Sequence, residues 1–312
     1  MASVLVCGSI AFDTITLFEG HFKEHILAEN IKSLSVSFFV PTMRKDFGGC
    51  AGNIAYSLNM LGAHAIPVAT VGKDGYDYIQ HFDRLGIDTK LIKILPDMFT
   101  AQCHITTDLD GNQIAAFHPG AMSQSAVNLI ENNNAAWAIV GPDSKEGMFA
   151  HAHRLHEQGI PFIFDLGQAM PLFDQKDIEE MVGLAHAMTL NDYEASVVEQ
   201  RLDKSISELS HHLEAIIVTR GAEGASLYIQ GEETKIPPCK AEKVCDPTGC
   251  GDAHRGGVLY GLINGWSWYD SACLGSLMGT LKIQEQGPQN YSYTRAEITA
   301  KLQEAYGITL DN

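Results

Sequence analysis

The sequence predicts an α/β fold: a three-layer αβα sandwich with a mostly parallel central sheet, plus a small β-rich lid. From residue 135 onward, short apolar runs alternate with segments of helical periodicity. Such alternation places helices on both faces of a parallel sheet. Residues 12–50 and 95–120 break this rhythm with paired strands, which we interpret as the lid. The chain has no internal repeat, low-complexity segment or charged linker, so we expect one domain over residues 1–312.

The first half of the chain predicts strand–helix units and one hairpin. Residues 3–8 are a short apolar run that ends in glycine, which is typical of a buried strand. Residues 53–61 and 75–85 have apolar positions at helical spacing, and the glycine that follows each one suits a helix end. The other predicted strands of this half are residues 65–71, 101–107 and 113–117, with a turn at 108–112.

The second half predicts a regular series of strands and helices. The predicted strands are residues 136–140, 161–165, 186–190 and 215–219, followed by a hairpin of 225–230 with 234–236. The predicted helices are residues 145–158, 192–201, 205–212, 250–263, 268–283 and 294–306.

The composition limits the partners and the compartment. The net charge of −17 repels nucleic acid phosphates and anionic membrane surfaces, so we expect neither as a partner. The seven cysteines are scattered without a C-x-x-C pair, which fits a reducing compartment. The N-terminus has no basic leader, and no apolar stretch reaches 18 residues. We therefore expect a cytoplasmic protein.

Residues 246–252, which read Asp-Pro-Thr-Gly-Cys-Gly-Asp, carry the most chemical information. Glycines let a backbone approach a ligand closely, and the free amides at a helix start attract anions. Asp252 would lie in the first turn of the following helix, where a carboxylate could accept the proton of an attacking hydroxyl. An ordinary helix start with a capping Asp remains an alternative. The chain has no G-x-x-x-x-G-K-[ST] segment, so a P-loop enzyme is excluded.

Five segments resemble, in the same order, the signatures of the ribokinase-like (PfkB) family of carbohydrate and nucleoside kinases. They are residues 8–13 (GSIAFD), 48–53 (GGCAGN), 191–194 (NDYE), 219–224 (TRGAEG) and 246–252 (DPTGCGD). Residues 116–122 (AFHPGAM) and 164–168 (FDLGQ) further resemble segments of bacterial adenosine kinases.

The resemblance implies catalytic and nucleotide-binding roles. It makes Asp252 the catalytic base and the amides of Gly249, Cys250 and Gly251 the anion hole. The implied ATP-binding residues are Asn191, Thr219, Gly221, Gly224, Thr248, Gly249 and Gly251. Glu194 and Asn191 would hold Mg²⁺ through water, although this pair equally suits a helix cap. Asp246 would help to bind a monovalent cation such as K⁺, as in some relatives.

The acceptor site is expected around Asp13, whose carboxylate suits the two vicinal hydroxyls of a ribose; a turn residue is the alternative. The resemblance adds Gly48, Gly49 and Asn53 to this pocket. Phe12 and Phe117 could stack on a purine base, or could simply pack within the lid. Sugar-phosphate kinases of the family often carry Lys after the glycine pair, whereas this chain has Cys50, which favours an uncharged acceptor.

These points predict an ATP- and Mg²⁺-dependent kinase that phosphorylates the 5′-hydroxyl of adenosine. A sugar kinase of the same family, acting on ribose or fructose, is the nearest alternative. A nucleoside-binding protein without turnover is another. The expected partners are small molecules, and the chain is expected to be a monomer or a homodimer.

Overall fold

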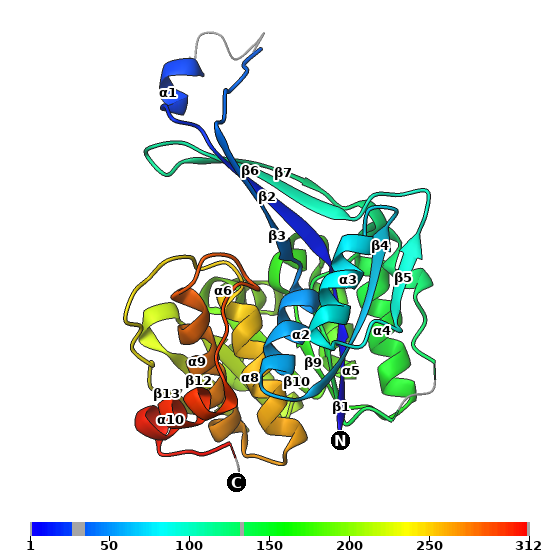
Figure 1. The fold of residues 1–312 in the computed structure, drawn as a ribbon. Coiled ribbons are helices and arrows are strands. Elements are labelled where there is room, and N and C mark those ends of the chain that lie inside the picture. The colour runs from blue at the N-terminus through cyan, green and yellow to red at the C-terminus, as the bar shows by residue number, and fades with distance from the viewer. Residues whose placement is uncertain (1, 27–34, 132–133, 311–312) are drawn as a thin grey trace.

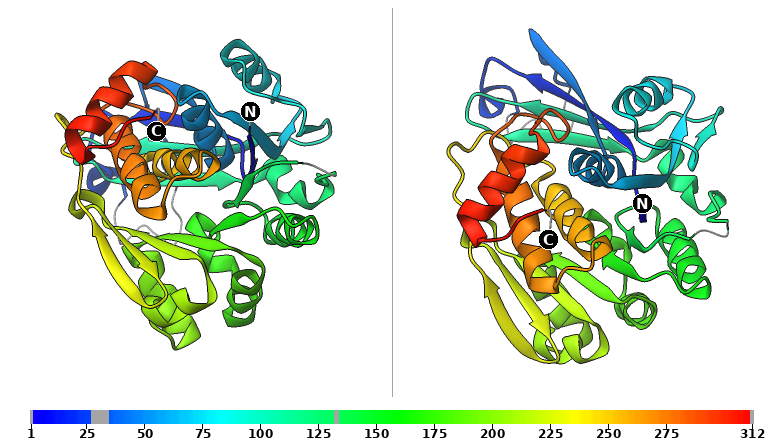
Figure 2. Two further views of the ribbon diagram at one scale, coloured as in Figure 1. Left: turned by 90° about the horizontal axis from the view of Figure 1, so that it is seen from below. Right: turned by 60° about the horizontal axis from the view of Figure 1, so that its bottom comes forward.

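The structure is a computed structural model that describes residues 2–26, 35–131 and 134–310. Its main body is a nine-stranded sheet between two layers of helices (Figures 1 and 2). The strands are β1 (Ser3–Cys7), β4 (His64–Gly72), β5 (Ile92–Leu95), β8 (Trp137–Val140), β9 (Phe162–Asp165), β10 (Ala187–Asn191), β11 (Ala215–Thr219), β12 (Ala225–Ile229) and β13 (Glu232–Ile236).

The order of the large sheet is β13-β12-β11-β10-β9-β8-β1-β4-β5. Every neighbouring pair from β11 to β5 is parallel, whereas β12 is antiparallel to both β11 and β13. This confirms the predicted mostly parallel sheet. Strand β5 was not predicted, because its four residues, Ile-Lys-Ile-Leu, are too short a run to show a clear pattern.

Two hydrophobic clusters lie on the opposite faces of the large sheet. Val4 and Val6 of β1 belong to one cluster, and Leu5 and Cys7 belong to the other, as the alternation of side chains along a strand requires. One face is covered by α2 (Cys50–Met60), α3 (Tyr76–Leu85), α8 (Cys250–Ile263), α9 (Trp268–Ile283) and α10 (Arg295–Tyr306). The other face is covered by α4 (Lys145–Glu157), α5 (Gln175–Leu184), α6 (Asp192–Leu202) and α7 (Ile206–Leu209).

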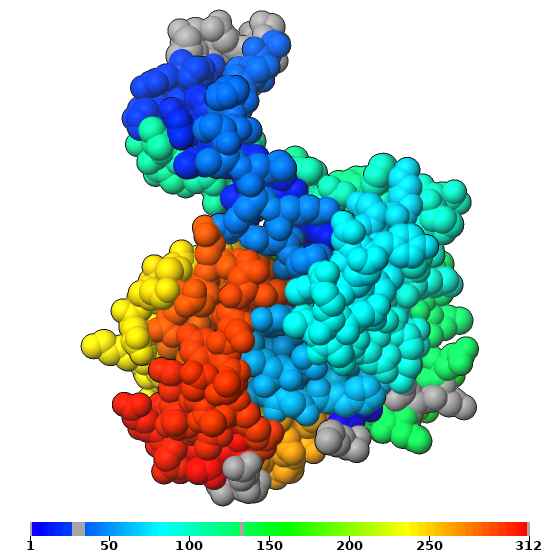
Figure 3. Space-filling view, viewed as in Figure 1, coloured from blue at the N-terminus to red at the C-terminus, as the bar shows by residue number. Residues whose placement is uncertain are grey.

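A second sheet of four strands stands above the carboxyl edge of the first (Figures 1 and 3). Its order is β3-β2-β6-β7, with β2 (Ala11–Leu17), β3 (Thr42–Gly48), β6 (Ala101–Thr107) and β7 (Gln113–His118). These strands come from the two segments predicted to form the lid, and the short helix α1 (Phe22–His25) lies at the far end of the sheet. Residues 27–34 of the predicted lid lie outside the described residues.

Helix α2 begins three residues earlier than predicted, at Cys50. Its N-cap is Gly49, with φ of 87°, and a Cβ there would lie 2.6 Å from the carbonyl oxygen of Ser9. Only glycine fits this close approach of two backbones. The chain therefore turns from β3 directly into α2, which places Asn53 in the first turn of the helix.

Helix α5 was not predicted, although it begins with a capping box formed by Asp174 and Asp177. The predicted helix at residues 205–212 is shorter than expected, because α7 gives way to a 3₁₀ turn at Ser210–His212. Within the described ranges, no helix has the length and apolar character needed to span a bilayer.

Candidate active site

The carboxyl ends of the parallel strands gather the polar residues of the site. Strand β9 ends at Asp165, β10 at Asn191 and β11 at Thr219, while β1 leads into Gly8 and Ser9. Open parallel sheets bind ligands at this edge, because loops there diverge to opposite faces. The second sheet continues directly from β1 through β2 and lies above the same edge.

Asp252 is held in the first turn of α8 by a residue of α2. Nδ2 of Asn53 donates to Oδ2 of Asp252 at 2.8 Å. Oδ1 of Asn53 accepts from Nε2 of Gln289 at 2.9 Å, and Gln289 also donates to the Tyr78 hydroxyl at 2.7 Å. The Tyr78 hydroxyl in turn donates to the carbonyl oxygen of Gly48 at 2.7 Å. This chain of hydrogen bonds fixes which face of Asn53 meets the carboxylate.

The surroundings of Asp252 raise the pKa of its carboxyl. Burial raises its pKa to about 6, while Arg255 and the hydrogen bond from Asn53 oppose the rise. A general base works best with a pKa close to the operating pH, so this shift suits proton acceptance.

Asp13 on β2 lies close enough to Asp252 for their charges to interact. Burial raises its pKa to about 6, and the negative charges of Asp46, Asp252 and Asp246 contribute further. Asp13 lies opposite Asp46 in the β2–β3 pairing. A Cβ at Gly48 would collide with the Asp13 carboxylate, so glycine leaves the room that this side chain needs. The structure therefore brings Asp13, Gly48, Gly49, Asn53 and Asp252 together, as expected.

A cavity of about 490 Å³ adjoins the start of α8 on the other side. Its lining includes the predicted ATP-binding residues Thr219, Gly221, Gly224 and Gly251. Cys250 and His254 also contribute to the wall. His254 is 5% exposed, and burial together with Arg255 lowers its pKa to about 3, so the imidazole is neutral. The cavity is large enough for a nucleotide, and its wall ends at the turn that carries Asp252.

The amide of Cys250 is hydrogen-bonded within the turn before α8. It donates to the carbonyl oxygen of Pro247 at 3.1 Å, which closes a turn before the helix. The contribution of this amide to an anion hole stays a prediction, as do those of Gly249 and Gly251 on either side of it. Gly249 has φ of 80°, and a Cβ there would lie 2.7 Å from Cβ of Pro288.

A buried ion pair supports the floor of the site. Arg255 of α8 pairs with Asp165 at the end of β9, and its Nη2 donates to Oδ1 of Asp165 at 2.8 Å. Burial would lower the pKa of Arg255, but Asp165 raises it above its usual value. Asp165 also helps burial to raise the pKa of Glu194. Asp165 and Arg255 were not among the predicted site residues. Each lies in or close to a segment that resembles the family, but the two are 90 positions apart in sequence, so their pairing could not be predicted from the sequence.

Asn191 and Glu194 form a capping box at the start of α6. Oδ1 of Asn191 accepts from the amide of Glu194 at 2.7 Å, and Oε2 of Glu194 accepts from the amide of Asn191 at 2.8 Å. The structural alternative for this pair is thus realised. Glu194 is only 8% exposed and lies close enough to Asp165 for their charges to interact, so the carboxylate also belongs to the site.

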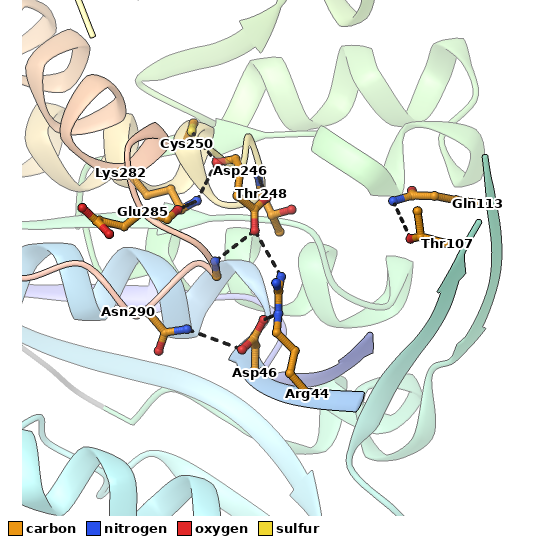
Figure 4. Close-up of polar contacts among 11 residues, drawn as sticks. Arg44, Asp46, Thr107, Gln113, Asp246, Thr248, Cys250, Lys282, Glu285 and Asn290 are labelled. Atoms are coloured by element: carbon orange, nitrogen blue, oxygen red, sulfur yellow. Dashed lines mark hydrogen bonds and ion pairs between the residues drawn. The ribbon is translucent and has the colours of Figure 1, made fainter. Parts of the chain in front are cut away.

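Asp246 organises the loop that precedes α8 (Figure 4). Its Oδ1 accepts from the amide of Thr248 at 2.9 Å, and its Oδ2 accepts from the amide of Gly287 at 2.9 Å. Burial alone would raise the pKa of this carboxyl, but the hydrogen bonds from these amides outweigh burial, so the pKa is lowered. Its backbone oxygen accepts from Nζ of Lys282 at 2.7 Å. Lys282 was not predicted as a site residue, because its sequence lies in an unremarkable part of a helix.

The two phenylalanines predicted to contact the substrate differ in exposure. Phe12 is 1% exposed and packs against Phe47, Tyr78 and the ammonium of Lys45, so its ring offers no free face to a ligand in this conformation. The predicted stacking role of Phe12 is corrected to packing beneath the site. Phe117 on β7 is 53% exposed.

Comparisons with known proteins agree with this architecture. The large mostly parallel sheet with a smaller second sheet is the fold of the ribokinase-like kinases. The pfkB family of carbohydrate kinases matches residues 1–295, and the chain belongs to this family.

Several relatives cover nearly the whole chain. A nucleoside kinase of Methanocaldococcus jannaschii is 26% identical over 277 residues, which are 88% of this chain and 91% of the relative. The solved structure of Burkholderia thailandensis nucleoside kinase in complex with inosine is 49% identical, with a TM-score of 0.89 over 98% of this chain and 99% of that chain. The complex of the same protein with ADP-inosine has a TM-score of 0.86 and covers 98% of this chain and 97% of that chain.

Proposed function

We propose that this protein is a nucleoside kinase that transfers the γ-phosphoryl group of ATP to the 5′-hydroxyl of a purine nucleoside. One observation carries the proposal: the first turn of α8 borders two sites. On one side, Gly251 lines the nucleotide-sized cavity with Thr219 and Gly224. On the other side, Asp252 accepts a hydrogen bond from Asn53 at 2.8 Å and interacts electrostatically with Asp13. A base thus lies between a donor site and an acceptor site.

The reaction follows from these positions. Asp13 accepts hydrogen bonds from the ribose hydroxyls, and Asn53 keeps the Asp252 carboxylate aimed at the 5′-hydroxyl. As the bond from the 5′-oxygen to the γ-phosphorus forms and the bond to the β,γ-bridging oxygen breaks, Asp252 takes the hydroxyl proton and ADP leaves. The amides of Gly249 and Gly251, at the positive end of α8, stabilise the negative charge on the moving group.

The residues near Glu194 fit a magnesium ion. Burial and the neighbouring Asp165 raise the pKa of Glu194, so its negative charge is only partly compensated within the protein. Carboxylate oxygens together with water are the ligands that Mg²⁺ prefers. When bound, the ion would neutralise charge on the ATP phosphates; Glu194 and Asn191 would hold it through water, and both keep their capping hydrogen bonds.

The small sheet supplies the acceptor side and shields it. Asp13 lies on β2, so a movement of this sheet toward the body would carry the ribose ligand with it. Exclusion of water at that step would suppress transfer of the phosphoryl group to water. Phe117 on β7 has the exposure needed to meet a base as the sheet closes.

The acceptor is proposed to be uncharged. The thiol of Cys50 lies where some sugar-phosphate kinases of the family carry a cation, and it donates to the carbonyl oxygen of Pro142 at 3.1 Å. The segments around Phe117 and Asp165 favour adenosine, while the inosine complex of the Burkholderia thailandensis relative adds inosine as a candidate.

A substrate panel tests the proposal. Adenosine, inosine, guanosine, ribose, fructose and fructose 6-phosphate are each incubated with ATP and Mg²⁺, and ADP release is followed. We expect kcat/KM for a purine nucleoside to exceed that for ribose or fructose by ~100-fold or more, because a base that fills its own subsite adds binding energy. A preference for ribose or fructose would assign a sugar kinase instead. Tight nucleoside binding without ADP release would assign a binding protein.

A further inference from the structure

Lys282 is a buried cation within the active-site framework. It lies in the last turn of α9 and has 0% exposure. Burial of an ammonium group is costly unless polar atoms replace its water, so a lysine in such a place calls for an explanation. Its own helix ends one residue later, at Ile283, so the ammonium lies near the negative end of the helix dipole.

The ligands of the ammonium group are backbone carbonyl oxygens. Nζ donates to the carbonyl oxygen of Asp246 at 2.7 Å and to the carbonyl oxygen of Glu285 at 3.0 Å (Figure 4). Converging backbone carbonyls are the arrangement by which proteins replace the hydration shell of K⁺. The Asp246 carboxylate is engaged elsewhere, with the amides of Thr248 and Gly287.

This arrangement does not fit a separate monovalent cation at Asp246. The carbonyl oxygen that the ion would use already accepts a hydrogen bond from a resident positive charge. Two like charges around one carbonyl would repel each other strongly in a buried place. We propose that the ammonium of Lys282 is a built-in replacement for a monovalent cation, which makes this kinase independent of K⁺.

The ammonium acts on the anion hole through the loop that it holds. The amides of Cys245 and Asp246 both donate to the carbonyl oxygen of Ile283, at 2.8 and 3.2 Å, so the loop is bonded to the end of α9. Lys282 joins the same two segments through its charge. Asp246 is only three residues before Gly249 in the sequence, so the position of this loop decides where the first turn of α8 begins. Lys282 is therefore a positioning residue.

The experiment removes the ammonium and offers cations in its place. Wild-type protein, Lys282→Ala and Lys282→Met are assayed in choline chloride, and then with added K⁺, NH₄⁺ or Li⁺. The wild type should turn over equally in every salt. Lys282→Ala should lose roughly 10–100-fold in kcat in choline, because the anion hole is misplaced. K⁺ or NH₄⁺ should restore most of this loss, and Li⁺ much less. Lys282→Met should stay impaired in every salt, because its side chain fills the space.

A control variant and a second readout separate the outcomes. Lys243→Ala removes a neighbouring lysine that pairs with the Glu285 side chain, at 57% exposure, and should show no dependence on cations. Without nucleotides, K⁺ should raise the melting temperature of Lys282→Ala by about 2–4 °C relative to choline, and should leave the wild type unchanged. The inference uses the proposed function only for the turnover assay, whereas the thermal shift stands without it.

Three results would each overturn the inference. The first is a wild type that K⁺ activates several-fold, which needs no variant to detect. The second is a Lys282→Ala protein with full turnover in choline. The third is an impaired Lys282→Ala protein whose turnover and melting temperature respond to no cation.

Discussion

Nη2 of Arg44 lies 3.3 Å from Oδ2 of Asp246, and its Nε donates to Oδ2 of Asp46 at 2.7 Å (Figure 4). Arg44 belongs to β3 of the small sheet, whereas Asp246 belongs to the loop before α8. One guanidinium group therefore joins the small sheet to the loop before α8. Because Asp46 pairs with Asp13 across β2 and β3, the same group also balances the carboxylates on the acceptor side.

Loss of this link should weaken acceptor binding. We expect Arg44→Met to raise KM for the nucleoside by about 5-fold, the equivalent of roughly 1 kcal/mol for a partly exposed ion pair, with little change in kcat. Steady-state kinetics at fixed ATP measure this. Lys23→Met is the control, because Lys23 pairs with Asp110 at the far end of the same sheet. Equal effects of the two variants on KM would contradict the proposed link.

Asp252→Asn should strongly reduce turnover without loss of ATP binding. The amide cannot accept the hydroxyl proton, so we expect kcat to fall by ~10²–10⁴-fold, while the ATP dissociation constant changes by less than ~3-fold. Kinetics and calorimetry measure the two quantities. Asp270→Asn, in the first turn of α9, is the matched control for the effect of an acid at a helix start. Turnover close to wild type in Asp252→Asn would remove Asp252 as the base.

A plot of kcat/KM against pH should fall on its acidic side, which is called its acid limb here. The pKa of Asp252 is raised to about 6, and a base must be deprotonated, so activity should fall as pH drops below about 6. Asp13, with a pKa of about 6, would steepen the limb. Asn53→Ala removes a hydrogen bond that lowers the pKa of Asp252, so its limb should move to higher pH. Asn59→Ala, on the same helix but bonded to the Leu85 carbonyl, should leave the limb in place.

Asp252→Asn should also stabilise the protein above pH 6. The pKa of Asp252 is higher in the folded protein than in the unfolded chain, so its charge disfavours folding once pH rises through about 6. Removal of the charge should raise the free energy of unfolding by about 1–3 kcal/mol at pH 7–8. The gain should shrink to a small fraction near pH 4, where the carboxyl is protonated in the folded protein and about half ionised in the unfolded chain. Urea unfolding at both pH values measures this, and a gain as large at pH 4 as at pH 7–8 would exclude the charge as its cause.

The sequence predicted the parts of the site that follow local rules. Alternating strands and helices gave the parallel sheet, and glycine-rich segments marked the starts of α2 and α8. The grouping of Asp13 and Asn53 with Asp252 followed from the family resemblance, since these residues lie up to 239 positions apart, from 13 to 252.

What the sequence did not predict depends on tertiary contacts. Lys282 lies at an ordinary position in a helix, and only the folded loop brings two carbonyl oxygens to its ammonium. Arg255 meets Asp165 across 90 positions, and Gln289 reaches Asn53 across 236. The choice between stacking and packing for Phe12 stayed open, because an aromatic residue beside Asp13 can point either into the pocket or beneath it, and the strand register decides which.

The thiol at position 50 restricts how this scaffold could evolve. The Cys50 sulfur lies 3.3 Å from Oγ of Ser9 and 3.1 Å from the carbonyl oxygen of Pro142. Gly8 has no side chain, and a Cβ there would lie only 2.9 Å from this sulfur. The side chain of a lysine at this position would need more space than these neighbours leave. Under the proposed function, a change of acceptor to a phosphorylated sugar would therefore require changes at Gly8 and around Ser9 and Pro142 together with a cation at position 50.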